Sequence, residues 1–134
     1  MAAHMGYGGV VSFSVGDLKK VFAQLHHKGE QFDMVIADPP KLAPTARHLE
    51  AAKKSYRRLN AGAIRLVKPG GILVSCSSSA ALRPTALMRI IGMAAGDAGR
   101  EVTLLMMGQQ GPDHPIPASF PEGRYLKCAV IQVR

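Results

Sequence analysis

The sequence predicts an α/β fold in which helices cover a mostly parallel sheet whose last strand is antiparallel. Short apolar runs alternate with segments of helical periodicity along most of the chain, and this alternation favours parallel strands joined by helical crossovers. The last two predicted strands follow one another without a helix, so the final strand must return antiparallel. The 134 residues are 47% hydrophobic and 19% charged, which is typical of one folded domain.

The N-terminal part predicts a lead-in, a strand and a helix. Residues 1–9 carry no periodic pattern and are predicted to be flexible. β-Branched and aromatic residues predict a strand over residues 10–15, which ends before Asp17. Apolar residues then recur at helical spacing and predict a helix over residues 17–28, which Gly29 ends.

The middle of the chain predicts a buried strand and a long basic helix. Residues 32–37 are nearly all apolar, which is typical of a central strand covered on both faces. The prolines at 39 and 40 prevent both strand continuation and an immediate helix. A helix is predicted over residues 45–67, and the sequence Lys-Pro-Gly-Gly at 68–71 predicts a tight turn.

The C-terminal part predicts two further strand–helix steps and the return strand. Residues 72–75 form an apolar strand that runs into a stretch of small polar residues. Pro84 opens a helix to residue 98, which Gly99 ends. Strands are predicted over residues 102–107 and 125–133, joined mainly by a polar, proline-rich loop at 108–123.

The charge balance favours a polyanionic partner. The net charge is +8 and the pI about 9.9, and basic residues gather between Lys41 and Arg65, where Glu50 is the single acid. This pattern favours an RNA-facing surface over a neutral solvated one. No apolar run approaches the roughly 20 residues of a membrane span. No signal peptide is recognisable either, so a cytoplasmic protein is expected.

The cysteine pattern argues against a structural metal site. Cys76 and Cys128 are the two cysteines of the chain, and they form no Cys-x-x-Cys pair. No metal site is therefore predicted, and reduced thiols are expected, with one disulfide between the two cysteines as the alternative. Cys128 stands in an apolar run and is predicted to be a core residue.

Chemistry-bearing residues follow the predicted strands at the edge where ligands bind in open α/β sheets. Asp17 follows the first predicted strand, Asp38 the second and Cys76 the third. The loop at 108–123 is predicted to lie at this same edge. Asp17 might equally cap the helix that it starts. A thiol at a strand end among serines is a candidate nucleophile, whereas Asp38 could also simply form a turn.

Several segments together resemble the large-subunit ribosomal RNA cytosine-C5 methyltransferases. The matching segments, which place the resemblance over roughly residues 10–134, are 32–41, 56–60, 69–77, 113–115 and 121–127. The resemblance implies a partial Rossmann-like sheet, corresponding to the C-terminal half of a class I methyltransferase domain. It also implies S-adenosylmethionine as cofactor and RNA as partner.

The family's chemistry implies a role for each matching residue. Members methylate C5 of cytosine, and addition of a thiolate to C6 makes C5 nucleophilic. The resemblance therefore implies Cys76 as nucleophile, favoured as a thiolate beside a helix N-terminus, and Asp38 at the base edge of a flipped cytosine. The implied cofactor-binding residues are Asp17, Leu18, Asp38 and Pro39. The implied substrate-binding residues are Pro40, Lys41, Arg57, Ser77 and His114.

One expected feature of such a domain is missing from the sequence. The glycine-rich turn that holds the methionine part of the cofactor cannot be found, because no strand precedes the glycines at 6, 8 and 9. We therefore expect a C-terminal piece of a longer enzyme, with weak or no binding of S-adenosylmethionine by itself. Residues 34–37 would then expose a sheet edge, which predicts a homodimer or a domain-swapped assembly.

Two other functions are compatible with the sequence. Enzymes that methylate an exocyclic amine of adenine or guanine also carry a polar residue before Pro-Pro, usually followed by an aromatic residue. Here Lys41 occupies the position of that aromatic residue, and methylation of an amine would leave the thiol of Cys76 without a catalytic role. Both observations favour methylation at C5. A non-catalytic RNA-binding fragment, held by the basic helix, is the second alternative.

Overall fold

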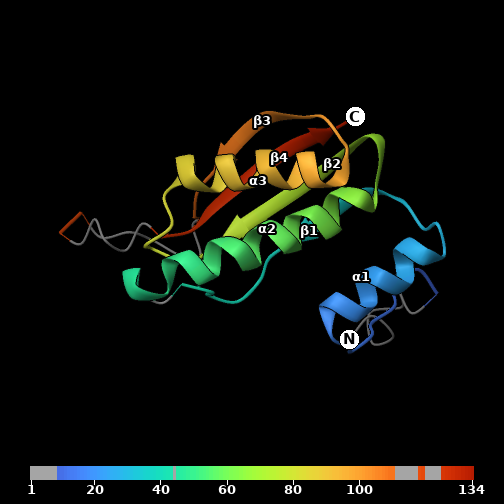
Figure 1. The fold of residues 1–134 in the computed structure, drawn as a ribbon, viewed down its shortest axis with the longest axis horizontal. Helices are drawn as coiled ribbons and strands as arrows, with labels where there is room; N and C mark the ends of the chain where they lie inside the picture. The colour runs from blue at the N-terminus through green and yellow to red at the C-terminus, as the bar shows by residue number, and fades with distance from the viewer. Residues whose placement is uncertain (1–8, 44, 111–117, 120–124) are drawn as a thin grey trace.

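The computed structural model describes residues 9–43, 45–110, 118–119 and 125–134, and within them it confirms the α/β prediction (Figure 1). The elements in chain order are α1 (Leu18–His27), β1 (Phe32–Ala37), a 3₁₀ turn η1 (Ala46–His48), α2 (Leu49–Arg65), β2 (Val67–Ser77), α3 (Pro84–Ala98), β3 (Val102–Gly108) and β4 (Lys127–Val133). Pro84 occupies the first turn of α3, and Gly99 ends that helix in a left-handed conformation, as predicted. No helix in these described ranges is long and apolar enough to cross a membrane.

The four strands form one sheet in the order β1-β2-β4-β3. β1 pairs with β2 in parallel, and β4 runs antiparallel to both β2 and β3. The predicted antiparallel return is therefore confirmed, and β4 fills the space between β2 and β3. Because β4 runs the other way, its first residues lie beside the carboxyl ends of the other strands. Ala37 pairs with Ser75, and Cys76 pairs with Cys128, at this one edge.

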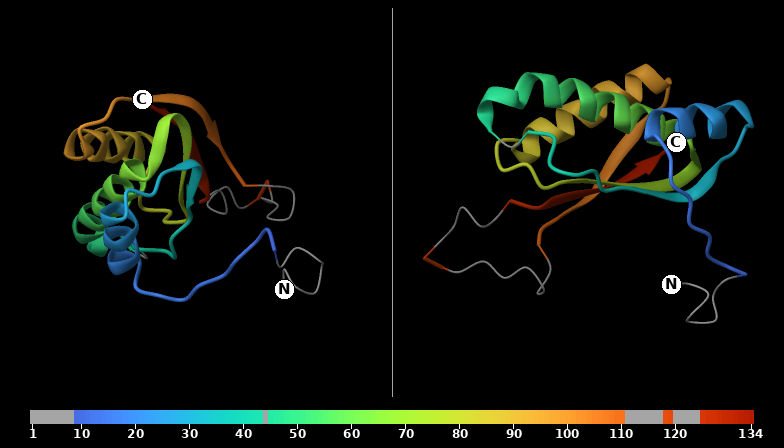
Figure 2. Two further views of the ribbon diagram at one scale, coloured as in Figure 1. Left: turned by 90° about the vertical axis from the view of Figure 1, so that its right-hand side faces the viewer. Right: turned by 90° about the horizontal axis from the view of Figure 1, so that it is seen from below.

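The helices cover a single face of the sheet (Figure 2). The core between helices and sheet contains fully buried aliphatic side chains from both layers: Ile64, Leu73, Leu87, Ile91 and Ile131. The expectation that β1 is covered on both faces is wrong for the described residues. Met34 is 53% and Ile36 65% exposed, because both side chains project from the face of the sheet that the described helices leave uncovered, while Ala37 on the other face is buried. The exposed edge matches the sequence-based expectation, and the assembly inferred from it stays a prediction.

Two predicted local structures are wrong. Residues 10–15 form no strand, because no described segment pairs with them, and Val10 and Phe13 stay 87% and 76% exposed. Residues 68–71 belong to β2 instead of forming a separate turn after the helix. Phe32 pairs with Val67 while Met34 pairs with Ile72, so the extra residues of β2 form a bulge.

Two helix-interior glycines give a matched test of how α1 packs on α2. A Cβ at Gly62 would clash with the ring of Phe22 on α1, whereas a Cβ at Gly92 on α3 meets nothing. We expect Gly92→Ala to stabilise the chain by about 0.5–1 kcal/mol, the usual helix preference for alanine. Gly62→Ala should instead destabilise it by about 1–3 kcal/mol through overpacking. Urea unfolding followed by circular dichroism measures both, and equal stabilisation by the two variants would disprove the packing argument.

Candidate active site

The two predicted catalytic residues lie at neighbouring strand tips. Asp38 follows Ala37 at the end of β1, and Cys76 follows Ser75 near the end of β2. The pairing of Ala37 with Ser75 places the next residue of each strand side by side. The negative charge of Asp38 is one of the causes that raise the pKa of the Cys76 thiol. Asp38 is exposed, so its carboxylate is accessible at this edge.

Cys76 contacts Cys128, its direct partner on the neighbouring antiparallel strand. The two sulfur atoms are 2.6 Å apart, with Cys76 buried and Cys128 half-buried. Burial, then the hydrogen bond and the charge of Cys128, then Asp38, raise the pKa of Cys76 to about 12. The expectation that Cys76 is held as a thiolate is therefore wrong for this state. The next helix, α3, begins only at Pro84, eight residues after Cys76, instead of directly after the thiol as expected.

The prediction that Cys128 is a core residue also needs correction. Side chains alternate between the two faces along a strand, and Ala129 and Ile131 are the β4 residues buried under the helices. Cys128 therefore projects from the other face, beside Cys76. The sequence left a disulfide between the two cysteines open, but it could not place them opposite each other, because 51 residues separate them and no local motif joins them.

A buried hydroxyl network supports the tip of β2. The Tyr56 hydroxyl on α2 lies 3.0 Å from both Ser77 Oγ and Ser79 Oγ. Ser79 Oγ also accepts a hydrogen bond from the backbone of Ala43, and the Ser79 carbonyl accepts one from Lys127 Nζ. Ser77 is fully buried and points toward the helices, so the structure places this predicted substrate-binding residue in the supporting network.

Lys127 is a buried cation that sequence reasoning did not single out. Its side chain is 6% exposed, and desolvation lowers its pKa from the ordinary lysine value. The ammonium group donates to the Ser79 carbonyl at 2.8 Å. It therefore joins the start of β4 to the loop after β2, directly beside the cysteine pair. Lys127 belongs to the segment 121–127 that resembles the methyltransferase family, but the resemblance gave no indication that this lysine holds the loop after β2.

A groove of about 680 Å³ separates α1 from α2 and reaches the loop after β1. Leu18 and Pro39, two of the predicted cofactor-binding residues, line it together with the predicted substrate-binding Pro40. Further lining side chains are Phe22, Leu42, Ser55, Arg58 and Leu59. The walls are mainly apolar, with cations at the rim, which suits a flat aromatic group that carries polar substituents.

Asp17 caps α1. Its carboxylate accepts a hydrogen bond from the backbone N–H of Lys20 at 3.3 Å, and its backbone is extended, as in an N-cap. The capping alternative is therefore confirmed. The first turn of α1 also carries Leu18 into the groove, so Asp17 orients a groove-lining element.

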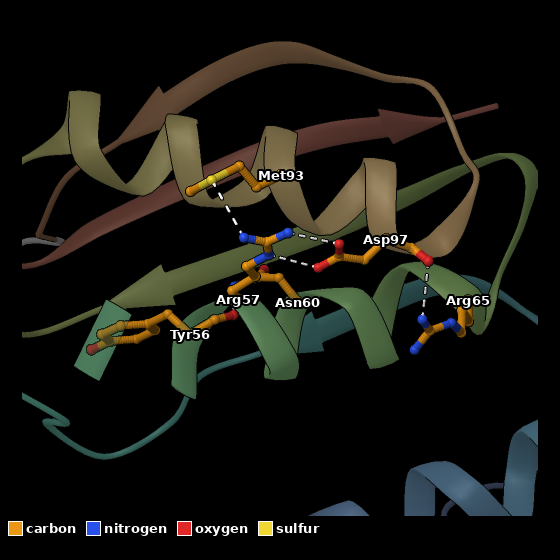
Figure 3. Close-up of polar contacts among 6 residues, drawn as sticks. All are labelled: Tyr56, Arg57, Asn60, Arg65, Met93 and Asp97. Atoms are coloured by element: carbon orange, nitrogen blue, oxygen red, sulfur yellow. Dashed lines mark hydrogen bonds and ion pairs between the residues drawn. The ribbon is translucent and has the colours of Figure 1, made fainter. Parts of the chain in front are cut away.

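Arg57, one of the basic residues of α2, is paired with an acidic residue of α3. Arg57 donates two hydrogen bonds to Asp97 on α3, at 2.7 and 2.8 Å, and Figure 3 shows this contact between the two helices. The contact raises the pKa of Arg57 and lowers that of Asp97. Arg57 thus joins α2 to α3, and the structure engages this predicted substrate-binding residue in a contact between helices.

Lys41 lies closer to the candidate site. Its Nζ lies 5.7 Å from the centre of the Tyr125 ring, which places a cation and an aromatic face at the edge where β4 begins. Arg58 lines the groove, and Lys54 is exposed on the same helix. The predicted substrate-binding residue His114 lies outside the described residues.

No family model matches the chain, but curated bacterial proteins named ribosomal RNA large subunit methyltransferase I are similar to it. It is 38% identical over 118 residues to the protein of Aeromonas salmonicida, which covers 88% of this chain and 30% of that protein. It is 39% identical over 123 residues to that of Shewanella amazonensis, covering 92% and 31%. The predicted resemblance to large-subunit ribosomal RNA methyltransferases is confirmed. The chain spans about 30% of the length of these curated relatives.

Solved methyltransferase structures share the fold. A SAM-dependent methyltransferase from Streptococcus mutans superimposes with a TM-score of 0.73 at 18% identity, over 97% of this chain and 34% of that one. A methyltransferase homolog from Pyrococcus horikoshii gives a TM-score of 0.61 at 19% identity, over 98% and 47%. The sheet and its helices therefore have the fold of part of a SAM-dependent methyltransferase.

Proposed function

We propose that this chain, a homologue of ribosomal RNA large subunit methyltransferase I, carries the catalytic strand tips of an S-adenosylmethionine-dependent enzyme that methylates C5 of a cytosine in ribosomal RNA. The observation that carries the proposal is the adjacency of Cys76 and Asp38 at two parallel strand tips. Ribosomal RNA as substrate places the enzyme in the cytoplasm. The exposed basic residues Lys41, Lys54 and Arg58 suit a polyanionic partner.

The chemistry assigns complementary tasks to the two residues. The Cys76 sulfur adds to C6 of the cytosine, which makes C5 nucleophilic, and it leaves again after C5 has lost its proton. A protonated Asp38 donates a hydrogen bond to N3 and withdraws electrons from the ring.

The groove between α1 and α2 fits the flat part of the cofactor. Leu18, Phe22 and Pro39 supply apolar walls next to Asp38, which suit an adenine ring. S-adenosylmethionine, when bound, supplies the methyl group that C5 accepts. The tasks of this chain are then to hold the adenosine side and to present the thiol and the carboxyl to the base.

Trapping with 5-fluorocytosine RNA tests the proposed reaction. Release of Cys76 requires removal of a proton from C5. Fluorine replaces that proton and cannot be removed in the same way, so the bond between Cys76 and C6 should persist. With the longest natural protein that contains this sequence, we expect a protein–RNA band on a denaturing gel that requires S-adenosylmethionine. Cys76→Ser should lose the band, and Cys128→Ser should keep it. Methylation of ordinary RNA without any trapped adduct would favour the exocyclic-amine alternative, and binding without methylation would favour the non-catalytic one.

A further inference from the structure

Cys76 and Cys128 have the arrangement that a disulfide between adjacent strands requires. They are direct partners in the antiparallel pair β2 and β4. Directly opposed residues in such a pair have Cα atoms about 4.5–5.5 Å apart. This spacing lies inside the range of about 4.4–6.8 Å that disulfides use. The sulfur atoms are already in contact, so closure of the bond needs no movement of either strand.

The pair is also accessible from one side. Ser77 faces the helices, where it bonds to Tyr56, so the preceding residue Cys76 projects from the opposite face of β2. The described helices leave that face uncovered (Figure 2). Cys128 is half-buried and Cys76 only 6% exposed, so a reagent meets Cys128 first.

We infer that Cys76 and Cys128 are a redox modification site, which closes to an intramolecular disulfide when the protein meets a small-molecule disulfide such as oxidised glutathione. The Cys128 thiolate attacks one sulfur of the reagent, and one glutathione thiolate leaves. Cys76 then loses its proton and attacks the Cys128 sulfur, releasing the second glutathione. The two protein thiols give up two protons and two electrons, and the reagent is reduced to two thiols.

The consequence for catalysis rests on the proposed function. The disulfide uses the sulfur that is proposed to add to the cytosine ring, so the oxidised protein has no nucleophile. Reduction returns both thiols and restores the site. The raised pKa of Cys76 slows its direct reaction with oxidants, because the thiolate is the reactive form. Cys128 therefore acts as the entry point for the oxidation.

The disulfide is tested on the 134-residue chain without RNA or cofactor. The reduced chain is incubated with oxidised glutathione, blocked with iodoacetamide and digested with trypsin under denaturing conditions. Cleavage after Arg65, Arg89 and Lys127 should place the cysteines in peptides 66–89 and 128–134. We expect these two peptides to be linked in a monomer whose intact mass has fallen by two hydrogens, and dithiothreitol should separate them.

Single-cysteine variants give the matched controls. Cys76→Ser and Cys128→Ser should each stop at a mixed disulfide that carries one glutathione, with the Cys128 thiol reacting faster than the Cys76 thiol. Two stable mixed disulfides on the wild-type chain, two unmodified thiols, or dimers linked between chains would overturn the inference. None of these results depends on methyl transfer, so a linked peptide pair combined with failed adduct trapping would reject the proposed reaction alone.

Discussion

Replacing Cys76 by serine is expected to lower kcat/KM for RNA methylation by at least about a thousandfold, because the hydroxyl is a much weaker nucleophile toward C6. The side chains have nearly the same shape, and among the described residues the side-chain hydrogen bond of Cys76 is the one to Cys128. The fold should therefore survive the change. The assay follows transfer of a labelled methyl group from S-adenosylmethionine to ribosomal RNA, using the longest natural protein that contains this sequence.

Cys128→Ala is the matched control for this loss. It removes the neighbour of Cys76 but leaves the proposed nucleophile in place, so methylation should persist. It also removes the hydrogen bond and the charge that help to raise the pKa of Cys76. The thiolate should then form more readily at neutral pH. A serine variant that keeps full activity, or an alanine control that loses as much, would reject Cys76 as the nucleophile.

The pH dependence of the same thiol has a defined sign. Because the pKa of Cys76 is raised to about 12, the folded state favours the neutral thiol, and the thiolate fraction rises about tenfold per pH unit up to that value. In a Cys128→Ala chain, the profile of Cys76 alkylation by iodoacetamide should lie at lower pH than in the wild type. Levelling of the wild-type Cys76 profile near the ordinary cysteine pKa of 9.0 would contradict the raised value.

The sequence predicts those elements whose signals are local. The prolines and glycines around α3 mark its ends, and the missing helix between β3 and β4 predicts the antiparallel return. The pattern of residues 10–15 is also local, and it failed because a strand exists only when another strand bonds to it. Ile36 is exposed for a different reason, because it projects from the sheet face that the described helices leave uncovered, which a local apolar run cannot indicate.

The candidate site also has features that local sequence predicts and features that depend on contacts with distant residues. Asp38 and Cys76 were predictable because polar residues directly after apolar strands share one edge of a parallel sheet. The state of Cys76 was not predictable, since burial and a partner 52 residues later in the chain control its pKa. Ser77 also lies at a strand tip, but side-chain alternation turns its hydroxyl toward Tyr56 under the helices, so its position in the sequence alone does not make it a ligand-binding residue. Strand tips can be located from local sequence, but which side chains face the ligand depends on pairing.

Tyr56→Ala is expected to destabilise the 134-residue chain by about 3–5 kcal/mol, the usual cost of removing a buried aromatic ring. Tyr56 is fully buried between α2 and the sheet, and its hydroxyl contacts Ser77 and Ser79. Tyr56→Phe keeps the ring but leaves these two buried serines with one partner fewer. We expect it to cost about 1–3 kcal/mol. Urea unfolding followed by circular dichroism gives both values.

The smaller substitution is the more informative of the two, because it separates packing from the hydroxyl network. Ser79 also bonds to Ala43 after β1 and to Lys127 on β4, so losing the Tyr56 hydroxyl should loosen the strand-tip edge as well as lower stability. Hydrogen exchange at the Ala43 amide should therefore accelerate in Tyr56→Phe. Lys54→Ala, an exposed change on the same helix, should stay within about 0.5 kcal/mol of the wild type and leave that amide unchanged. If Tyr56→Phe behaves like Lys54→Ala in both measurements, the hydroxyl network does not hold the strand tips.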